Sequence, residues 1–345
     1  MIDKKFWQDK KILVTGHTGF KGSWLACYLK YLGSEVYGVS DSKIISDNYK
    51  LLNKKEIFVE EFNLDISIDD KELNNLMQQN FDIVFHLAAQ GIVSTAQKKP
   101  IETLNANIIG TYNVLNSVNQ NNYTKGLIIS TTDKVYAESE KYNTEDSKLG
   151  GKEFYSASKA SAEHVIAAYI NTSLSNNLNI GVVRSGNVLG GGDGASDRIV
   201  ADIINSLFEN KNISIRNPES VRPWQYILDS LNGYLMASEY CIKNSKNEIF
   251  NIGSAENNEK NVIELTESII QKWGNKTIEI EIINNSFYES NFLRIDSEKA
   301  ESLLGWKSFF NFEMISEAIV DWYKNFQNNE NITMSQIDKF HKMSS

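Results

Sequence analysis

The chain has 345 residues, of which 41% are hydrophobic and 23% charged, and its formal net charge is −9. These values are typical of a folded globular protein that is large enough for two lobes. The sequence has no basic stripe and no apolar run near the roughly 20 residues of a membrane span, which argues against nucleic acid or a membrane as partner.

Short apolar runs alternate with helical patterns through the first half of the chain. The runs, typical of buried strands, cover residues 11–16, 35–39, 57–62, 82–89, 126–131 and 179–188. Helical patterns lie at 20–33, around 70–80, at 101–121 and at 155–171. This alternation predicts an α/β fold with a Rossmann-like, doubly wound parallel sheet, in which ligands bind at the carboxyl ends of the strands.

The alternation changes after Gly190, where the loop GGGDGASDR is followed by short helices and strands. We therefore expect an NAD-binding Rossmann domain over residues 1–187. A smaller C-terminal α/β lobe for substrate binding is expected over 188–330, with part of it threaded back into the sheet. Residues 331–345 are polar, and we expect them to form a tail that frays.

The segment TGHTGFKGSW follows the first apolar run and opens the first helical pattern, with Gly16, Gly19 and Gly22 three residues apart. Glycine lets the backbone approach a ligand closely, and the N-terminus of a helix favours a phosphate group. An ordinary glycine-rich turn would show the same spacing. The strand–loop–helix context instead favours a dinucleotide-binding loop.

Residues that follow the next strands extend this predicted cofactor site. Ser40 and then Asp41 end the second strand, where an acidic residue would hold ribose hydroxyls. No arginine follows to hold an additional phosphate, so NAD is favoured over NADP. Asp65 follows the third strand, where it either meets an adenine edge or acts as a helix cap or turn residue. Ala88 and Ala89 are small residues where a cofactor must pass.

The helical segment YSASK contains Tyr155 and Lys159, which are four residues apart and therefore share one helix face. An ammonium beside a phenol favours the phenolate, so we expect Lys159 to lower the pKa of Tyr155. A tyrosine tuned in this way can take a proton from an alcohol while a nicotinamide accepts a hydride.

With these motifs, the chain resembles the extended short-chain dehydrogenase/reductase family from about Lys11 to about Trp306. The resemblance implies two lobes, a nicotinamide cofactor, a nucleotide-diphosphate sugar as substrate, and a homodimer formed through helices 101–121 and 155–171. It adds Thr18, Phe20, Lys21, Ile66 and Gln90 to the expected cofactor-binding residues, together with Tyr155 and Lys159.

The tip of the fifth predicted strand, STTDKVY, distinguishes reaction types within this family. Sugar 4-epimerases usually carry Ser or Thr followed by residues that do not ionise, whereas 4,6-dehydratases carry Thr-Asp-Glu or Thr-Asp-Lys. Eliminating water across C5 and C6 requires a base and an acid. The resemblance therefore implies that Thr132 and Tyr155 bind O4, that Asp133 is the acid at O6, and that Lys134 is the base or acts only electrostatically. The alternative is that Asp133 and Lys134 form a loop salt bridge.

The lysine version of this tip, together with RSGNVLGGGD and RNPESVRPWQY, most resembles the 4,6-dehydratases that act on CDP-glucose. It implies that Asn187 meets the diphosphate or the sugar and that Arg222 pairs with a phosphate. Arg198 and Arg216 are further candidates for the substrate, and we expect Trp224 to be a core residue.

Departures from the family pattern keep alternatives open. AAQGIVSTAQ lacks an expected Pro and Arg, and Phe154 stands where the family tends to carry proline. A GDP- or UDP-linked hexose or heptose is therefore an alternative substrate, and 4-epimerisation is an alternative reaction. A non-catalytic protein that senses a cofactor on the same fold is a third hypothesis.

The remaining features concern metal and location. Two cysteines and four scattered histidines fit neither a disulfide framework nor a metal site. The sequence does not open with a signal-peptide block, so we expect a cytoplasmic enzyme.

Overall fold

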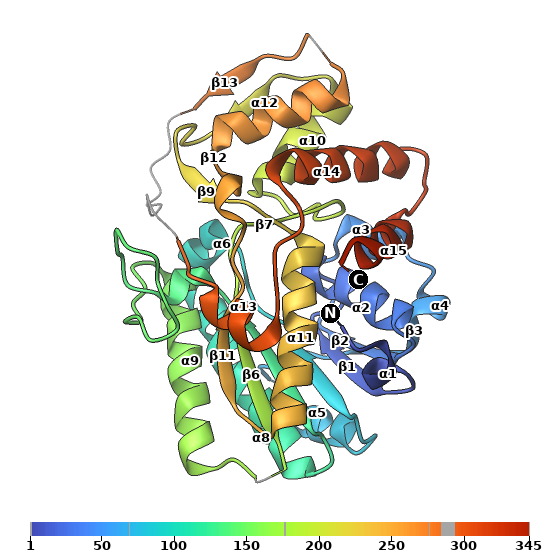
Figure 1. Cartoon of the computed structure of the whole chain (residues 1–345), viewed down its shortest axis with the longest axis vertical. Coiled ribbons are helices and arrows are strands. Elements are labelled where there is room, and N and C mark those ends of the chain that lie inside the picture. The colour runs from blue at the N-terminus through green and yellow to red at the C-terminus, as the bar shows by residue number, and fades with distance from the viewer. Residues whose placement is uncertain (1, 69, 176, 276, 284–293, 345) are drawn as a thin grey trace.

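The computed structural model describes residues 2–68, 70–175, 177–275, 277–283 and 294–344. Its centre is a seven-stranded sheet in the order β11-β6-β5-β4-β1-β2-β3, in which every neighbouring pair is parallel (Figure 1). The strands are β1 (Lys11–Thr15), β2 (Glu35–Ser40), β3 (Phe58–Asn63), β4 (Ile83–His86), β5 (Gly126–Thr131), β6 (Asn179–Arg184) and β11 (Glu248–Asn251). The prediction of a doubly wound parallel sheet is thus confirmed.

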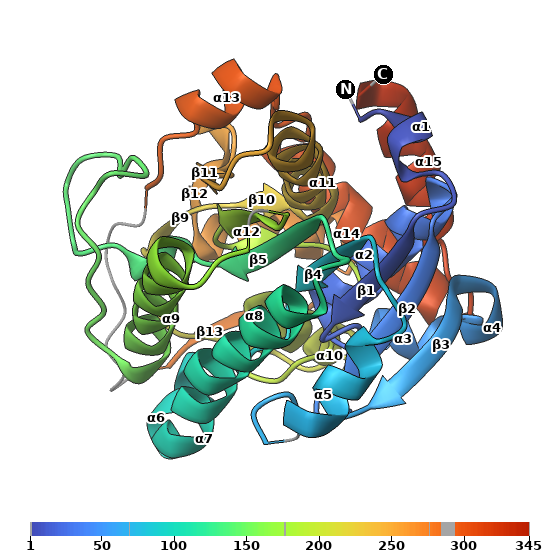
Figure 2. The same ribbon diagram turned by 90° about the horizontal axis from the view of Figure 1, so that it is seen from below.

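Successive residues of the central strands face opposite layers of helices, as β1 shows. Ile12 and Val14 of β1 belong to one apolar cluster, with α2 (Phe20–Tyr31) and α11 (Ile227–Asn244). Leu13, between them, belongs to the other, with α5 (Asp70–Met77), α8 (Gly110–Asn121) and α9 (Phe154–Thr172). Figure 2 shows these two layers on either side of the sheet. Burial on both faces explains why the central strands β1, β4, β5 and β6 are apolar runs without alternation.

The helix predicted over 101–121 is not one regular α-helix. It consists of α7 (Pro100–Leu104), a π-helical turn (Asn105–Ile109) and α8. The turn adds a residue to the helical repeat, a feature that the spacing of apolar residues does not reveal.

A smaller lobe lies above the carboxyl ends of the strands (Figure 1). It contains α10 (Ile199–Glu209), α12 (Val262–Trp273), α14 (Phe312–Phe326) and the strand pairs β8 (Ile213–Ile215) with β13 (Ile280–Ile282) and β9 (Val221–Pro223) with β12 (Glu259–Asn261). The chain also returns to the sheet, because β11 pairs with β6 and α11 packs against β5 and β6. The boundaries at residues 187 and 330 stay predictions.

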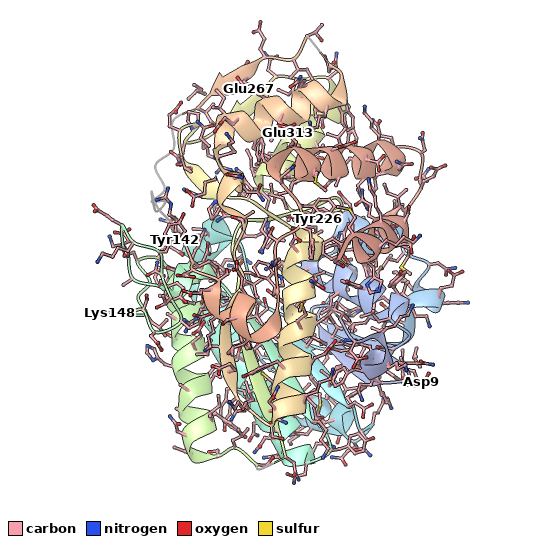
Figure 3. All side chains as sticks on the ribbon, viewed as in Figure 1. Asp9, Tyr142, Lys148, Tyr226, Glu267 and Glu313 are labelled. Atoms are coloured by element: carbon pink, nitrogen blue, oxygen red, sulfur yellow. The ribbon has the colours of Figure 1, made fainter. Side chains whose placement is uncertain are left out.

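Other short elements complete the chain: α1 (Lys4–Trp7), α3 (Asp47–Leu51), α4 (Lys54–Ile57), α6 (Val93–Lys98), η2 (Asp133–Val135), β7 (Val188–Leu189) with β10 (Gln225–Tyr226), η3 (Glu256–Asn258) and α13 (Glu298–Leu304). In Figure 3, Asp9 and Lys148 lie at the outside of the molecule, whereas Tyr226 lies between the lobe and the sheet. The Tyr226 ring stacks on Phe310 with centroids 4.2 Å apart. None of the described helices has the length and apolar content that crossing a membrane requires.

The prediction of a fraying polar tail was wrong. Residues Thr333–Ser344 form helix α15, which buries Ile337 and Phe340. The Phe340 ring meets Tyr28 of α2 edge-on, with centroids 6.4 Å apart. Two apolar residues three positions apart suffice to attach a mostly polar helix to the core.

Candidate active site

One cleft of about 1170 Å³ runs between the carboxyl ends of the strands and the smaller lobe. All the residues expected from the sequence line it: Gly16, Thr18, Gly19, Phe20, Lys21, Gly22, Ser40, Asp65, Ile66, Ala88, Ala89, Gln90, Thr132, Asp133, Lys134, Tyr155, Lys159, Asn187, Arg198, Arg216 and Arg222. The fold therefore gathers residues as far apart in the chain as Gly16 and Arg222. The described residues contain no group of three or more His, Cys, Asp or Glu side chains suited to a metal ion.

The glycine loop is a tight backbone cradle at one end of this cleft. Gly16 has a φ of +73°, and a Cβ there would lie 2.8 Å from Ala88. A Cβ on Gly22 would lie 2.2 Å from the carbonyl oxygen of Gly16. Helix α2 starts immediately after Gly19, and no side chain caps it. Only glycine fits this geometry, and it leaves the helix N-terminus open to an anion.

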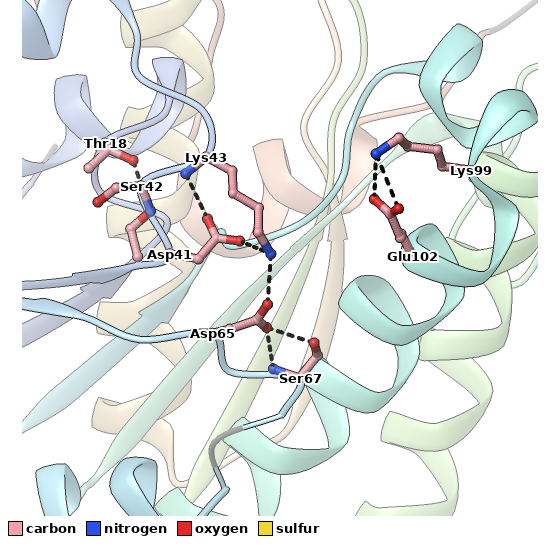
Figure 4. Close-up of polar contacts among 9 residues, drawn as sticks. Thr18, Asp41, Ser42, Lys43, Asp65, Ser67, Lys99 and Glu102 are labelled. Carbon is pink, nitrogen blue, oxygen red and sulfur yellow. Dashed lines mark hydrogen bonds and ion pairs between the residues drawn. The ribbon is translucent and has the colours of Figure 1, made fainter.

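Polar side chains surround the end of β2 (Figure 4). The Ser40 hydroxyl lies 2.9 Å from that of Thr18. Lys43 forms ion pairs with Asp65 at 2.8 Å and with Asp41 at 2.9 Å. Burial alone would raise the pKa of Asp65, but hydrogen bonds from Lys43 and Ser67 outweigh it and lower the pKa. This corner therefore carries one positive charge, on Lys43, between two carboxylates.

Figure 4 also shows an exposed pair at the start of α7, in which Lys99 donates to Glu102. Asp65 additionally accepts from the backbone N–H of Ser67 at 3.0 Å, as a turn-forming residue does. The Asp65 side chain therefore shapes a turn, as one of the two interpretations held, and it also lines the cleft, where contact with adenine stays a prediction.

Tyr155 and Lys159 lie on the first turns of α9, whose N-terminus is capped by Glu153. The Lys159 ammonium donates to the carbonyl oxygen of Ser130 at 3.0 Å. Burial raises the pKa of Tyr155 to about 12, although a hydrogen bond with Thr132 opposes the shift. The expectation that Lys159 lowers the pKa of Tyr155 is therefore wrong for the protein alone, because the ammonium is directed to a backbone carbonyl and desolvation dominates at the phenol.

Asp133, which follows strand β5, has a buried side chain that lines the cleft. Thr132 caps the short η2 turn and donates to Asp133 at 2.9 Å, and the amide of Asn187 lies 3.4 Å from the other carboxylate oxygen. Asp133 is only 2% exposed. The carboxylate packs on Gly186, where a Cβ would lie 1.9 Å from it.

Lys134 is half-buried, and its ammonium lies 6.0 Å from the centroid of the Tyr155 ring. Among the ion pairs of the described residues, none joins Asp133 to Lys134. The two side chains therefore do not neutralise each other as a loop salt bridge would. Both line the cleft beside Tyr155.

A buried ion pair lies behind the tip and was not expected from the sequence. Glu163 of α9 is bonded by Arg184 of β6 and accepts from the hydroxyl of Thr131 at 2.6 Å. Arg184 also donates to the Tyr136 hydroxyl at 2.7 Å. These contacts fix the residues on either side of the Thr132–Lys134 segment.

Asn107, in the π-helical turn, was also missed. Its side chain accepts from the backbone N–H of Gln90 at 2.8 Å and lies 2.8 Å from the Ser158 hydroxyl. It thus joins the Ala88–Gln90 wall of the cleft to helix α9. One sequence signal was available for both missed residues. Asn107 is a polar residue inside a helical pattern, and Arg184 is a charged residue inside a strand pattern.

The arginines expected at the substrate already have protein partners. Arg198 lies 3.4 Å from Asp193, and Arg216 lies 2.9 Å from Asp197. Arg222 is buried and donates to the carbonyl of Val221 at 2.9 Å.

Trp224 is 4% exposed and belongs to the core, as predicted, although its edge also borders the cleft. Its indole N–H donates to the carbonyl of Lys260 at 2.9 Å. This bond leaves the ring fixed between β9 and β12.

Comparison with known proteins finds a matching family model and similar individual proteins. A model of the NAD dependent epimerase/dehydratase family matches residues 12–253. The chain is 34% identical over 335 residues to CDP-glucose 4,6-dehydratase of Salmonella typhimurium, covering 94% of this chain and 93% of that protein.

Solved structures share the fold. The dTDP-glucose 4,6-dehydratase of Bacillus anthracis str. Ames, in complex with NAD, matches with a TM-score of 0.77 and 23% identity over 92% of this chain and 97% of that chain. The UDP-glucose 4-epimerase of Thermus thermophilus, in complex with NAD, matches with a TM-score of 0.79 and 22% identity, over 91% and 98% of the two chains. Dehydratases and epimerases therefore share this architecture, and the chemistry has to be argued from the site.

Proposed function

The chain belongs to the NAD dependent epimerase/dehydratase family, and from this premise we propose that it is an NAD-dependent nucleotide-sugar 4,6-dehydratase, a hydro-lyase. One observation carries the choice of reaction. Asp133 and Lys134 line the cleft beside Tyr155 and form no ion pair with each other among the described contacts. Elimination of water needs an acid and a base in addition to Tyr155, whereas epimerisation at C4 needs only the group that takes the O4 proton.

CDP-glucose is the proposed substrate, and CDP-4-keto-6-deoxyglucose and water are the products. The support is the likeness to the Salmonella enzyme over 94% of this chain and the segment RNPESVRPWQY. A GDP- or UDP-linked hexose or heptose is the alternative substrate, because the segment AAQGIVSTAQ departs from the family pattern and its residues 90–94 line the cleft.

The cleft fits NAD. The cradle of Gly16, Gly19 and Gly22 excludes side chains where a pyrophosphate would approach, and Ser40 ends β2 where ribose hydroxyls would be met. We assign Thr18, Phe20, Lys21, Asp65, Ile66, Ala88, Ala89 and Gln90 to the remaining wall of the cofactor site. When bound, NAD supplies the acceptor for a hydride from C4 and the donor of that hydride to C6 of the sugar.

Tyr155 and Thr132 are the proposed partners of the sugar O4. Tyr155 takes the O4 proton as C4 is oxidised, and Thr132 holds the same oxygen. Since burial raises the pKa of Tyr155 to about 12 in the protein alone, ionising the phenol near neutral pH requires additional positive charge in the loaded site. Lys159, one turn along α9, is the protein group that contributes to it.

Asp133 and Lys134 are the proposed elimination pair. Once C4 is a ketone, the C5 proton is acidic, and Lys134 removes it or stabilises the charge that develops. Asp133 gives its proton to O6, which leaves as water. The bonds from Thr132 and Asn187 hold the Asp133 carboxyl at one orientation for this step.

The anionic half of the substrate is assigned to the lobe side of the cleft. Arg222 is the proposed partner of a phosphate, with Arg198, Arg216 and Asn187 as further substrate contacts. For Arg198 and Arg216, binding means exchanging the carboxylates of Asp193 and Asp197 for the diphosphate.

We also propose a homodimer formed through helices 101–121 and 155–171. Supporting it, Ile109 and Tyr112 are each 45% exposed beside α9. A cytoplasmic location stays a prediction.

A panel of nucleotide sugars tests the reaction. Purified protein with NAD is incubated with CDP-, UDP-, GDP- and dTDP-glucose, and products are weighed by mass spectrometry. Loss of one water from CDP-glucose supports the proposal. An unchanged mass with altered stereochemistry identifies a 4-epimerase, and tight NAD binding with no reaction on any sugar identifies a non-catalytic protein.

A further inference from the structure

Tyr234 is a fully buried residue of α11 whose hydroxyl meets three polar side chains from three different elements. It lies 2.8 Å from the Ser130 hydroxyl of β5, 2.9 Å from the Ser185 hydroxyl that follows β6, and 3.2 Å from the Lys21 ammonium of α2. A phenol has one proton and two lone pairs, so these three partners saturate it. The hydroxyl therefore has one fixed position.

Lys21 is held by the same group of hydroxyls. Its ammonium donates to Ser185 at 3.0 Å as well as to Tyr234, and Ser185 is bonded in turn to Ser230 of α11 at 3.3 Å. Lys21 lines the cleft, but Tyr234 does not. Tyr234 therefore lies behind the cleft wall and acts on a ligand only through other residues.

Ser130 connects this group to the Tyr155–Lys159 pair. Its hydroxyl meets Tyr234, while its carbonyl oxygen accepts from the Lys159 ammonium at 3.0 Å. The Lys159 ammonium therefore contacts Ser130 directly, and the Lys21 ammonium is linked to the same residue through the Tyr234 hydroxyl. Like charges in buried surroundings disfavour each other.

The charges that face Lys159 come from several elements. Burial and then the Lys21 ammonium lower the pKa of Lys159 to about 8, and Glu163 on its own helix opposes them. His86 of β4 also faces Lys159, but burial keeps it uncharged by lowering its pKa to about 3. Tyr155 is neutral in the protein alone, so among the described groups Lys21 is the cation whose charge lowers the pKa of Lys159.

We propose that Tyr234 is a positioning residue, which fixes the Lys21 ammonium behind the tip of β5 and thereby sets the charge of Lys159. Its effect on turnover rests on the proposed function, in which Lys159 assists Tyr155. The effect of Tyr234 on the charge of Lys159 does not rest on the proposed function, because the contacts of Tyr234 and Lys21 exist in the protein without substrate.

The test follows the titration of Lys159 directly. Protein free of sugar is acetylated with a limiting amount of acetic anhydride across a pH series, and the Lys159 peptide is quantified by mass spectrometry. In Tyr234→Phe, the Lys21 ammonium keeps only the hydrogen bond to Ser185 and turns towards water. The pH midpoint of Lys159 acetylation should therefore rise by roughly one unit, which is the size of the effect of a nearby like charge. Lys21→Met should raise it at least as much.

The double variant separates a path through Lys21 from a general disturbance. If Tyr234 acts through Lys21, then Tyr234→Phe adds no shift in the Lys21→Met background. Tyr226→Phe is the matched control, because Tyr226 is also fully buried and its hydroxyl is bonded to Gln336, away from Lys159. In Tyr226→Phe, the midpoint of Lys159 acetylation should equal that of the wild type.

Two results would overturn the proposal. One is an unchanged Lys159 midpoint in Tyr234→Phe, and the other is an equal shift with and without Lys21. Should Tyr234→Phe not fold, an unchanged midpoint in Lys21→Met alone overturns it. Failure of every sugar to react would leave these midpoints as they are, so it contradicts the proposed function and not this inference.

Discussion

Lys134 has two proposed roles, and two variants separate them. Lys134→Ala removes both a base and a charge, so C4 oxidation should persist while dehydration falls by about 100-fold or more. Lys134→Arg keeps the charge but cannot deprotonate at neutral pH. Rapid-mixing absorbance of the reduced cofactor and mass spectrometry of the product measure the two steps. Arginine should restore dehydration if Lys134 acts electrostatically, and complete turnover in the alanine variant would exclude Lys134 from the mechanism.

The close packing of the Asp133 carboxylate on Gly186 can be tested by substitution. A Cβ at position 186 would lie 1.9 Å from the Asp133 carboxylate, so Gly186→Ala must displace the acid. A displacement of about 1 Å commonly costs about 100-fold in rate. Dehydration with CDP-glucose is the measurement. Gly91→Ala is the control, because a Cβ there has its nearest neighbour, Arg198, at 3.5 Å and should leave the rate within a few-fold.

His86 makes folding stability depend on pH. Thr111 donates to the Asn107 carbonyl, so its oxygen accepts from one ring nitrogen of His86, while Thr15 donates to the other. Burial lowers the pKa of His86 to about 3, below its unfolded value. The unfolded chain therefore binds the proton first, and the stability contributed by neutral His86 is complete above about pH 6.5 and declines as the pH falls towards 3.

This pH dependence can be measured with urea unfolding at a series of pH values. His86→Gln should flatten it by up to about 1.4 kcal/mol per pH unit between these limits. His164→Gln is the control, because His164 is exposed on α9 and should leave the slope unchanged. A wild-type slope retained in His86→Gln would show that another group controls it.

For single residues, the sequence predicted which ones line the cleft, because most of their motifs lie at the ends of strands. It did not find the direction of the Tyr155 pKa. Spacing on a helix puts Lys159 on the same face as Tyr155, but only the fold reveals that the Ser130 carbonyl takes the ammonium and that the phenol is desolvated.

At the scale of elements, α9, β5 and β6 are joined by the buried Glu163–Arg184 pair. Removing one partner leaves an uncompensated charge, so Arg184→Met should lower the free energy of unfolding by about 3–5 kcal/mol. The double variant Glu163→Leu with Arg184→Met should lose less than the two single losses combined. Denaturant unfolding measures all three.

A surface pair gives the comparison. Lys211 and Glu209 are 71% and 59% exposed, so Lys211→Met should change stability by less than about 1 kcal/mol. Equal losses from Lys211→Met and Arg184→Met would contradict the role given to the buried pair.

The elements themselves were largely predictable from apolar runs and helical spacing, but their irregularities were not. The π-helical turn at Asn105–Ile109 keeps the helical pattern of its neighbours, so the sequence suggested one continuous helix. The turn depends on tertiary contacts, since Asn107 bonds to the backbone of Gln90 and to Ser158.

At the scale of the whole molecule, local composition was a poor guide to the C-terminus. Residues 331–345 are mostly polar, yet α15 packs on α2 at the opposite end of the sequence. Such a contact depends on where the fold brings the two segments, and two apolar side chains carry little signal in a sequence window.

Assembly is the property of the whole molecule that a solution measurement decides. Ile109 and Tyr112 are each 45% exposed on the outer side of the 101–121 segment, and Tyr112 meets Tyr169 of α9 at a ring distance of 6.3 Å. Burying this apolar surface against a second copy would remove it from water. We therefore expect a dimer by light scattering.

A charge in that surface should separate the copies, because it would be desolvated on association without a partner. Tyr112→Lys should give a monomer at micromolar concentration with unchanged thermal unfolding of the chain itself. Tyr123→Lys is the matched control, since Tyr123 is equally exposed at 45% but follows the end of α8, and its mass should stay that of the wild type. A wild-type monomer, or a dimer that survives Tyr112→Lys, would mean that the interface lies on another face.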